Sequence, residues 1–323
     1  MAERISRRSF LEASTSCAAH LAFVSLGAQP WARRFVRTDR QRKVVTEEPW
    51  GRLEELGDGL WALISTPLEG ERLTLCNGGI IAGADGVMVV ESFASAGGAT
   101  WMAEQARTLT GRWPSHVVLT HFHGDHTGGI EGSASVGSPG IYATAVTRDL
   151  TIESERGREE VSESRLAILA DVVVVPDAPT TIDLGGRFVR LAPREGHTPS
   201  DVTIELDDHS VMFCGDLVWN RMFPNYRDAI PSRLSRDVRA LRRNSITTYV
   251  PGHGPLGNNS DLELFIQLID SVEDAARRAH EQGLPAAEAA ETYKVPPSLG
   301  EWVMFSEQYY EVALRAWERE LGA

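Results

Sequence analysis

The chain has 323 residues, of which 42% are hydrophobic and 24% charged, and it contains no long polar tract of low complexity. This composition fits one large globular domain. The formal net charge is −13, and residues 1–43 carry an excess of six positive charges, so the rest of the chain has a net charge of −19. Such an acidic body repels phosphate groups, which argues against nucleic acid as a partner.

The first thirty residues have the pattern of an export signal. Arg7 and Arg8 precede a short, mildly apolar stretch over residues 13–28, as in a twin-arginine signal peptide. Serine and histidine residues interrupt the stretch and make it too short and too polar for a stable membrane anchor. We therefore expect a periplasmic or secreted protein with a signal at 1–30 and a charged linker at 31–50. A chance arginine pair in an ordinary amphipathic helix is the alternative.

Apolar runs predict the first sheet of a domain over residues 51–260. The expected strands are 60–64, 79–81, 86–90 and 117–119, with a helix over 97–110 before the last of them. Residues 145–170 are rich in Arg and Glu and are predicted to be helical, beside the site or over it. After residue 30 only Cys76 and Cys214 remain, too few for a disulfide framework. We expect both to be packing residues, with a single bridge between them as the alternative.

Residues 261–323 are predicted to be helices packed on this domain. Apolar residues recur at helical spacing after Asp261, and Gly283 and Pro285 then interrupt the pattern. A further helix is predicted over 301–321, with Trp302 and Phe305 on its aromatic face. We interpret this face as a packing surface, and a wall for the substrate is the alternative.

The most informative motif lies directly after the predicted strand 117–119. It places His121, His123, Asp125 and His126 within six residues, with glycines around them. Imidazole nitrogens and carboxylate oxygens are ligands that suit zinc and related divalent ions. Glycine allows the tight loop that ligands so close in sequence need in order to converge. A polar surface loop without a metal is the alternative.

Three further candidate ligands occur in a similar context. His197, Asp216 and His253 each follow an apolar or β-branched run and stand next to a glycine. Strand ends that deliver polar side chains to one place are how rigid scaffolds hold reactive loops. Four separate segments therefore predict one metal centre.

With these residues the chain resembles the metallo-β-lactamase superfamily, from about residue 60 to about residue 256. The resemblance implies a four-layer αββα sandwich, here followed by a C-terminal helical extension. It implies that His121, His123 and His197 bind a first metal, that Asp125, His126 and His253 bind a second, and that Asp216 bridges the two. At the position of Glu91 the family usually has an aspartate that orients a ligand, so Glu91 is a longer substitute.

The resemblance implies a hydrolase with two zinc ions, with iron or manganese as alternatives, acting on a small molecule. Two divalent ions convert a bound water to hydroxide at neutral pH, which is the nucleophile that opening an ester, lactone, thioester or lactam requires. Asp125 is expected to orient this hydroxide and to accept its proton. Tyr226 or Asn220 is expected to stabilise an oxyanion, unless these side chains satisfy the backbone of their own loop.

Asp216 bears on the choice among related activities. True β-lactamases of the superfamily generally have cysteine or serine at this position, which favours lactonase-like or glyoxalase II-like hydrolases. A true β-lactamase stays an alternative within the family. A mononuclear iron enzyme of the persulfide-dioxygenase type is the alternative from another class, since the same side chains can hold one iron. An accessory protein with an idle site has little support, because the set of seven ligands is complete.

Overall fold

The computed structural model describes residues 42–65 and 71–322, all of which belong to one compact unit, Thr38–Ala323. The predicted signal at 1–30 and the predicted linker up to residue 41 lie outside the described residues. Within the described part, no helix is both long and apolar enough to cross a bilayer. Cys76 and Cys214 are buried free thiols, so the alternative of a bridge between them is not realised.

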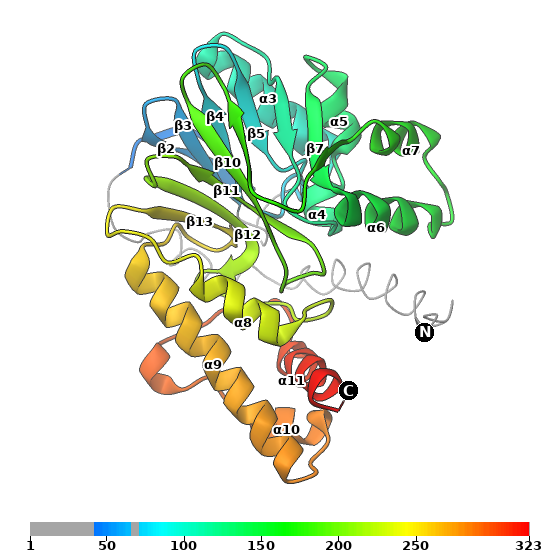
Figure 1. The fold of residues 1–323 in the computed structure, drawn as a ribbon, viewed down its shortest axis with the longest axis vertical. Coiled ribbons are helices and arrows are strands. Elements are labelled where there is room, and N and C mark those ends of the chain that lie inside the picture. Colours follow the sequence, from blue (N-terminus) through cyan, green and yellow to red (C-terminus); the bar gives the residue numbers. More distant parts are fainter. Residues whose placement is uncertain (1–41, 66–70, 323) are drawn as a thin grey trace. The chain divides into compact units, whose positions relative to one another are not determined.

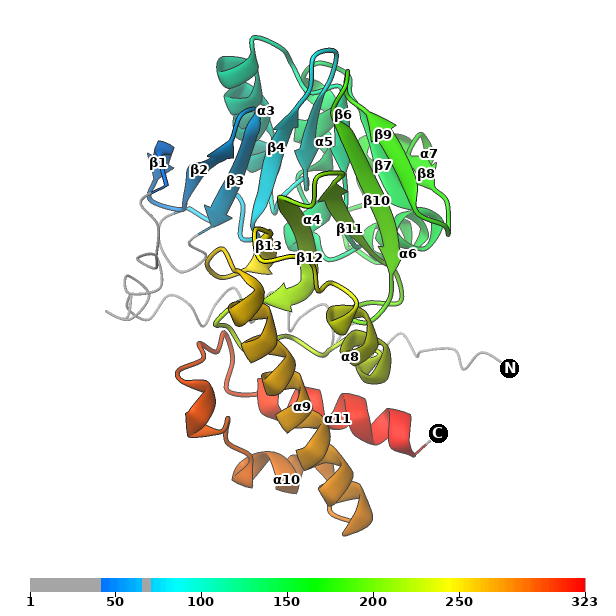
Figure 2. The ribbon, with the colours of Figure 1, turned by 60° about the vertical axis from the view of Figure 1, so that its left-hand side comes forward.

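The first sheet has eight strands that follow one another in chain order from β1 to β8 (Figures 1 and 2). Neighbours from β1 to β5 are antiparallel, and β5 to β8 run parallel. The strands are β1 Val44–Glu48, β2 Gly51–Gly57, β3 Leu60–Ser65, β4 Gly78–Ala82, β5 Val87–Val90, β6 His116–Val118, β7 Gly140–Thr144 and β8 Val173–Val175. Strand β1 occupies the end of the stretch predicted as a linker, so the sheet begins before residue 51.

The second sheet has five strands in the order β13-β12-β11-β10-β9. Strands β12 and β13 run parallel, and the other neighbours are antiparallel. The strands are β9 Thr180–Asp183, β10 Phe188–Arg194, β11 Asp201–Leu206, β12 Val211–Trp219 and β13 Thr248–His253.

Apolar side chains fill both faces of the first sheet. On β3, Ala62 and Ile64 belong to the cluster shared with the second sheet, whereas Leu63 belongs to the cluster shared with the helices. Successive strand residues point to opposite faces, so this continuous apolar run is buried on both. The helices on the outer face of the first sheet are α3 Ala96–Thr110, α5 Ile130–Ser135 and α7 Glu163–Ala170. The two sheets pack face to face, and helices cover the outer face of the first sheet, as the predicted αββα sandwich requires.

The second sheet is covered by α8 (Pro231–Arg239) and α9 (Asn259–Glu281), both of which contact β12. The chain then forms α10 (Ala286–Thr292), a 3₁₀ turn at Pro297–Leu299, and α11 (Tyr309–Leu321), which confirms the predicted helical extension. The predicted helix over 301–321 is wrong in its first part, because the chain becomes helical only at Tyr309. The stretch 145–170 consists of two helices, α6 (Ala145–Arg156) and α7, rather than one.

Candidate metal centre

Four segments of the chain bring the predicted ligands together. The histidine-rich loop follows β6 and continues into the short helix α4 (Gly124–Thr127). His197 lies in the loop after β10, and His253 is the last residue of β13. Asp216 lies within β12 rather than after a strand, because β12 extends to Trp219. All seven predicted ligands fall into two adjacent groups.

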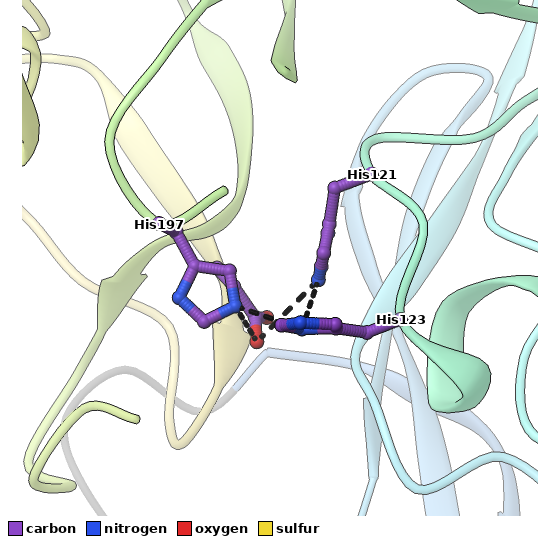
Figure 3. A group of neighbouring side chains, drawn as sticks. His121, His123 and His197 are labelled. Carbon is purple, nitrogen blue, oxygen red and sulfur yellow. Dashed lines mark hydrogen bonds and ion pairs between the residues drawn. The ribbon is translucent and has the colours of Figure 1, made fainter. Parts of the chain in front are cut away.

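The first group contains three histidines and Asp216. Figure 3 shows the rings of His121 and His123, from the loop after β6, converging with the ring of His197 from the loop after β10. The Nδ1 atom of His123 lies 3.1 Å from Nε2 of His121 and 3.1 Å from Nε2 of His197. A tetrahedral zinc ion with bonds of about 2.0–2.1 Å separates its ligand atoms by about 3.3 Å. The three nitrogens therefore have the spacing of atoms that share one ion.

Hydrogen bonds around the first group show why these nitrogens require a cation. Thr120 donates its hydroxyl proton to Glu91, so Thr120 Oγ1 accepts from Nδ1 of His121 at 3.0 Å. Burial keeps the pKa of His121 well below its usual range, so the ring is neutral and its Nε2 carries a lone pair. The Nε2 of His123 donates to Asp228 at 2.9 Å, which places a lone pair on its Nδ1 when that ring is neutral. Two lone pairs that face each other at 3.1 Å repel, and a shared metal ion removes this repulsion.

The second group contains Asp125, His126 and His253. The Nε2 atom of His253 lies 3.2 Å from Asp125 Oδ2, and that of His126 lies 3.5 Å from the same oxygen. Asp216 reaches both groups, since its Oδ1 lies 3.1 Å from His126 Nε2 and its Oδ2 lies 3.3 Å from Nε2 of both His197 and His253. The two oxygens of this one carboxylate connect the groups, as expected of a residue that bridges two ions.

Two glycines make room for Asp216. Gly215 has a φ of 52°, in the left-handed region that favours glycine, at a shift in the register between β12 and β13. A Cβ atom on Gly252 of β13 would lie 1.9 Å from Oδ1 of Asp216, so only glycine lets this backbone approach the carboxylate. Local backbone geometry therefore places the bridging side chain.

The charge of the site falls on its carboxylates and imidazoles. Burial alone would lower the pKa of His253, but Asp216 and Asp125 outweigh it and raise the pKa to about 9. For Asp125, His126 and His253 outweigh the effect of burial and hold the pKa of the carboxyl below its usual range. Asp125 is therefore ionised at neutral pH. The two groups concentrate negative charge that a proton or a divalent ion must balance.

Glu91 orients ligands of both groups. Its Oε1 lies 3.0 Å from Nδ1 of His126 and accepts the hydroxyl proton of Thr120 at 2.6 Å, while its Oε2 accepts the Thr120 N–H at 3.2 Å. Glu91 has a φ of 80°, which is costly for a residue with a Cβ and persists only where the surroundings enforce it. Glu91, which stands where the family usually has an aspartate, thus reaches the ligand His126.

Asp228 was not identified from the sequence as a site residue. It lies between β12 and α8, and its contact with His123 joins positions 105 residues apart. The sequence predicted the donors Asn220 and Tyr226 in this part of the chain, whereas the residue that contacts a ligand is the acceptor Asp228. A carboxylate that holds the distal nitrogen of a metal-binding histidine fixes the tautomer and the ring orientation.

The surroundings of the two predicted oxyanion donors do not favour that role. Asn220 donates its side-chain amide to the carbonyls of Pro255 and Leu256, so it satisfies neighbouring backbone. Tyr226 is fully buried, and burial together with Tyr293, Glu273 and Asp270 raises the pKa of its hydroxyl. Those three neighbours belong to the C-terminal extension, and none of them is a candidate ligand. We therefore leave both out of the proposed catalytic residues.

A buried ion pair supports the ligand loop from behind. Arg165 donates to the carbonyl oxygens of Gly128 and Thr127 at 2.8 and 2.9 Å, at the end of the helix that carries Asp125 and His126. Glu155 lies 3.1 Å from the Nε atom of Arg165. A buried guanidinium at a helix C-terminus satisfies carbonyls that have no partner in the helix.

Comparisons with known proteins agree with this geometry. A family model described as the metallo-beta-lactamase superfamily matches residues 72–253, which include all seven candidate ligands. A metallo-beta-lactamase type 2 of Bacillus sp. (strain 170) is 28% identical over 163 residues, or 49% of this chain and 57% of that protein. A linear primary-alkylsulfatase of Pseudomonas sp. is 21% identical over 273 residues, or 70% of this chain and 51% of that protein.

A structural likeness extends further along the chain. The stereoselective inverting sec-alkylsulfatase Pisa1 of Pseudomonas sp. aligns with a TM-score of 0.64 at 19% identity, over 84% of this chain and 50% of that one. This chain spans about half the length of the curated relatives it matches. Because the family model covers more than half of the sequence, the chain belongs to the metallo-beta-lactamase superfamily.

Proposed function

We propose that the protein is a hydrolase that binds two zinc ions and opens an ester, lactone, thioester or lactam bond of a small molecule. The observation that carries this proposal is the position of Asp216, whose two oxygens reach the nitrogens of both ligand groups. Histidine nitrogens in the first group, and mixed nitrogen and oxygen donors in the second, form the donor set that suits zinc.

When bound, the two ions supply a hydroxide at neutral pH and stabilise negative charge on the substrate. The side chains of this chain fix where that chemistry takes place. Asp125 is ionised, and its side chain is 28% exposed, so it can orient the hydroxide and accept its proton. Glu91 and Asp228 hold His126 and His123 in the orientations described above.

A second candidate is hydrolysis of a sulfate ester. The alkylsulfatase relative matches 70% of the chain, whereas the β-lactamase relative matches 49%. Asp216 further favours activities other than β-lactam hydrolysis, for the reason given above. The twin-arginine pattern supports export to the periplasm or the exterior, which we retain as part of the proposal.

The decisive experiment is elemental analysis of protein purified from its native compartment without added metal. We expect about two zinc ions per chain, and hydrolysis of a lactone, thioester, sulfate ester or β-lactam by the same preparation. An Asp216→Asn variant should bind metal more weakly at both groups. One iron per chain, with oxygen-dependent turnover of a thiol compound, would overturn the proposal in favour of the mononuclear iron alternative.

A further inference from the structure

The segment between the 3₁₀ turn and α11 pairs with the chain that leaves β12. Val303 donates its N–H to Arg221 at 3.0 Å, and Phe223 donates to Val303 at 2.8 Å. Met222 and Val303 thus form a short parallel bridge. This pairing uses backbone groups that a helix would otherwise satisfy internally, which accounts for the absence of a helix before Tyr309.

The pairing places Phe305 beside the second ligand group. Its ring centroid lies 5.8 Å from that of His253 and 5.7 Å from that of Trp219, with the rings nearly perpendicular in both pairs. Trp219 itself lies 4.1 Å from His253 and is 3% exposed. Phe305 is only half-buried, so part of its ring faces outward from this aromatic cluster.

A second aromatic side chain borders the first ligand group. Phe122 is half-buried, and its ring centroid lies 4.7 Å from that of His123. His123 and Asp125 are themselves partly exposed, at 17% and 28% of their side chains. Solvent therefore reaches His123 and Asp125, and each ligand group has an apolar ring beside it. Ligand sites combine such apolar surface with a few polar groups.

We propose that Phe305 is a specificity-determining residue that binds an apolar acyl or alkyl chain of the substrate. The substrate class is then an ester, or a related bond, that carries a chain of several carbons. This inference rests on the proposed function and narrows it. The sequence placed Phe305 on a packing face of a helix, with a wall for the substrate as the alternative, and our proposal adopts the alternative.

The test uses the metal-loaded full chain and p-nitrophenyl esters from acetyl to octanoyl. Each methylene group buried on Phe305 should raise kcat/KM by at most about fourfold, since burial contributes about 0.8 kcal/mol per methylene. In Phe305→Ala the ratio of octanoyl to acetyl kcat/KM should fall by about tenfold or more. The matched control is Phe188→Ala, because Phe188 is 42% exposed on β10 and takes no part in the site. This control should keep the ratio of the unsubstituted protein.

The outcomes separate this inference from the proposed function. A ratio near one in the unsubstituted protein, or an unchanged ratio in Phe305→Ala, would overturn the role of Phe305 while leaving the hydrolase intact. If the protein holds two ions but cleaves none of the esters, calorimetry with octanoate and acetate tests the same contact. Tighter binding of octanoate that is lost in Phe305→Ala supports the role, and equal binding of the two anions refutes it.

Discussion

Replacing Glu91 by glutamine tests how the outer carboxylate controls the metal centre. Glu91 accepts two hydrogen bonds, from the Thr120 hydroxyl and the Thr120 N–H, and its Oε1 lies 3.0 Å from Nδ1 of His126. Alanine would leave two buried donors without acceptors, at about 1–3 kcal/mol each, and would remove the charged neighbour of His126, which together is a large fraction of the stability of a domain. Glutamine is the better perturbation, because its oxygen at the Oε1 position keeps the bond from the Thr120 hydroxyl and the contact with His126.

The expected effect of Glu91→Gln has two parts. The new amide group faces the Thr120 N–H, so one buried donor loses its acceptor, at a cost of about 1–3 kcal/mol in the free energy of unfolding. Loss of the negative charge beside His126 should weaken metal binding in the second group by about 10- to 100-fold, equivalent to about 1.4–2.7 kcal/mol. The second ion should therefore dissociate at a chelator concentration that leaves the unsubstituted protein loaded.

The assay is competition with a chromophoric chelator, combined with denaturant unfolding of the metal-free protein. Glu205→Gln is the matched control, because Glu205 is 2% exposed but its partners are Arg243 and His209, outside both ligand groups. It should lower stability without changing metal affinity. Equal affinity of Glu91→Gln and the unsubstituted protein for the second ion would refute the orienting role of Glu91.

Three further predictions follow from the same geometry. Asp228→Asn should weaken metal binding through His123 by about tenfold, because the carboxylate that holds this ring is lost. The loss of stability should be small, since the Asp228 side chain is 36% exposed. An unchanged metal affinity in chelator competition would contradict this role of Asp228. The pKa of His253 is raised to about 9, so this ring is protonated in the metal-free protein at pH 7.5 and must release a proton when an ion binds. The apparent affinity for the metal ion should therefore rise by up to about tenfold per pH unit and level off above pH 9. Calorimetry in buffers of different ionisation enthalpy should detect the released proton. Arg165→Met should destabilise the chain by about 3–5 kcal/mol in denaturant unfolding, because the buried Glu155 keeps only the exposed Arg158 as an ion-pair partner and the carbonyls of Thr127 and Gly128 lose their donor. A loss below about 1 kcal/mol would show that the pair is not needed.

Residues whose chemistry and local pattern coincide could be identified from the sequence. The cluster from His121 to His126 is a ligand set on its own, and His197, Asp216 and His253 stand next to glycines after apolar runs. Four strands of the first sheet, β3 to β6, were recognisable because their apolar runs are buried on both faces. The structure brings these seven side chains into two groups.

The features that the sequence did not predict depend on contacts between distant segments of the chain. Nothing near Asp228 indicates a partner 105 residues earlier, and the fate of Tyr226 depends on a helix that the chain forms about fifty residues later. The helical period before Tyr309 was misleading, because backbone pairing with the exit of β12 replaces the helix there. Periodicity reports which local conformation buries apolar residues, but it carries no information about which remote backbone offers an alternative partner.

The sequence by itself indicated the family and the candidate metal ligands, because both depend on residue type and on short-range pattern, and the resemblance to that family implied the sandwich of two sheets. Only the tertiary structure decided that Asp216 spans both groups, that Glu91 and Asp228 hold the ligand rings, and that Phe305 borders the site. The physical reason is that side-chain direction in loops is set by packing and hydrogen bonds across the fold, which exist only once remote segments have come together.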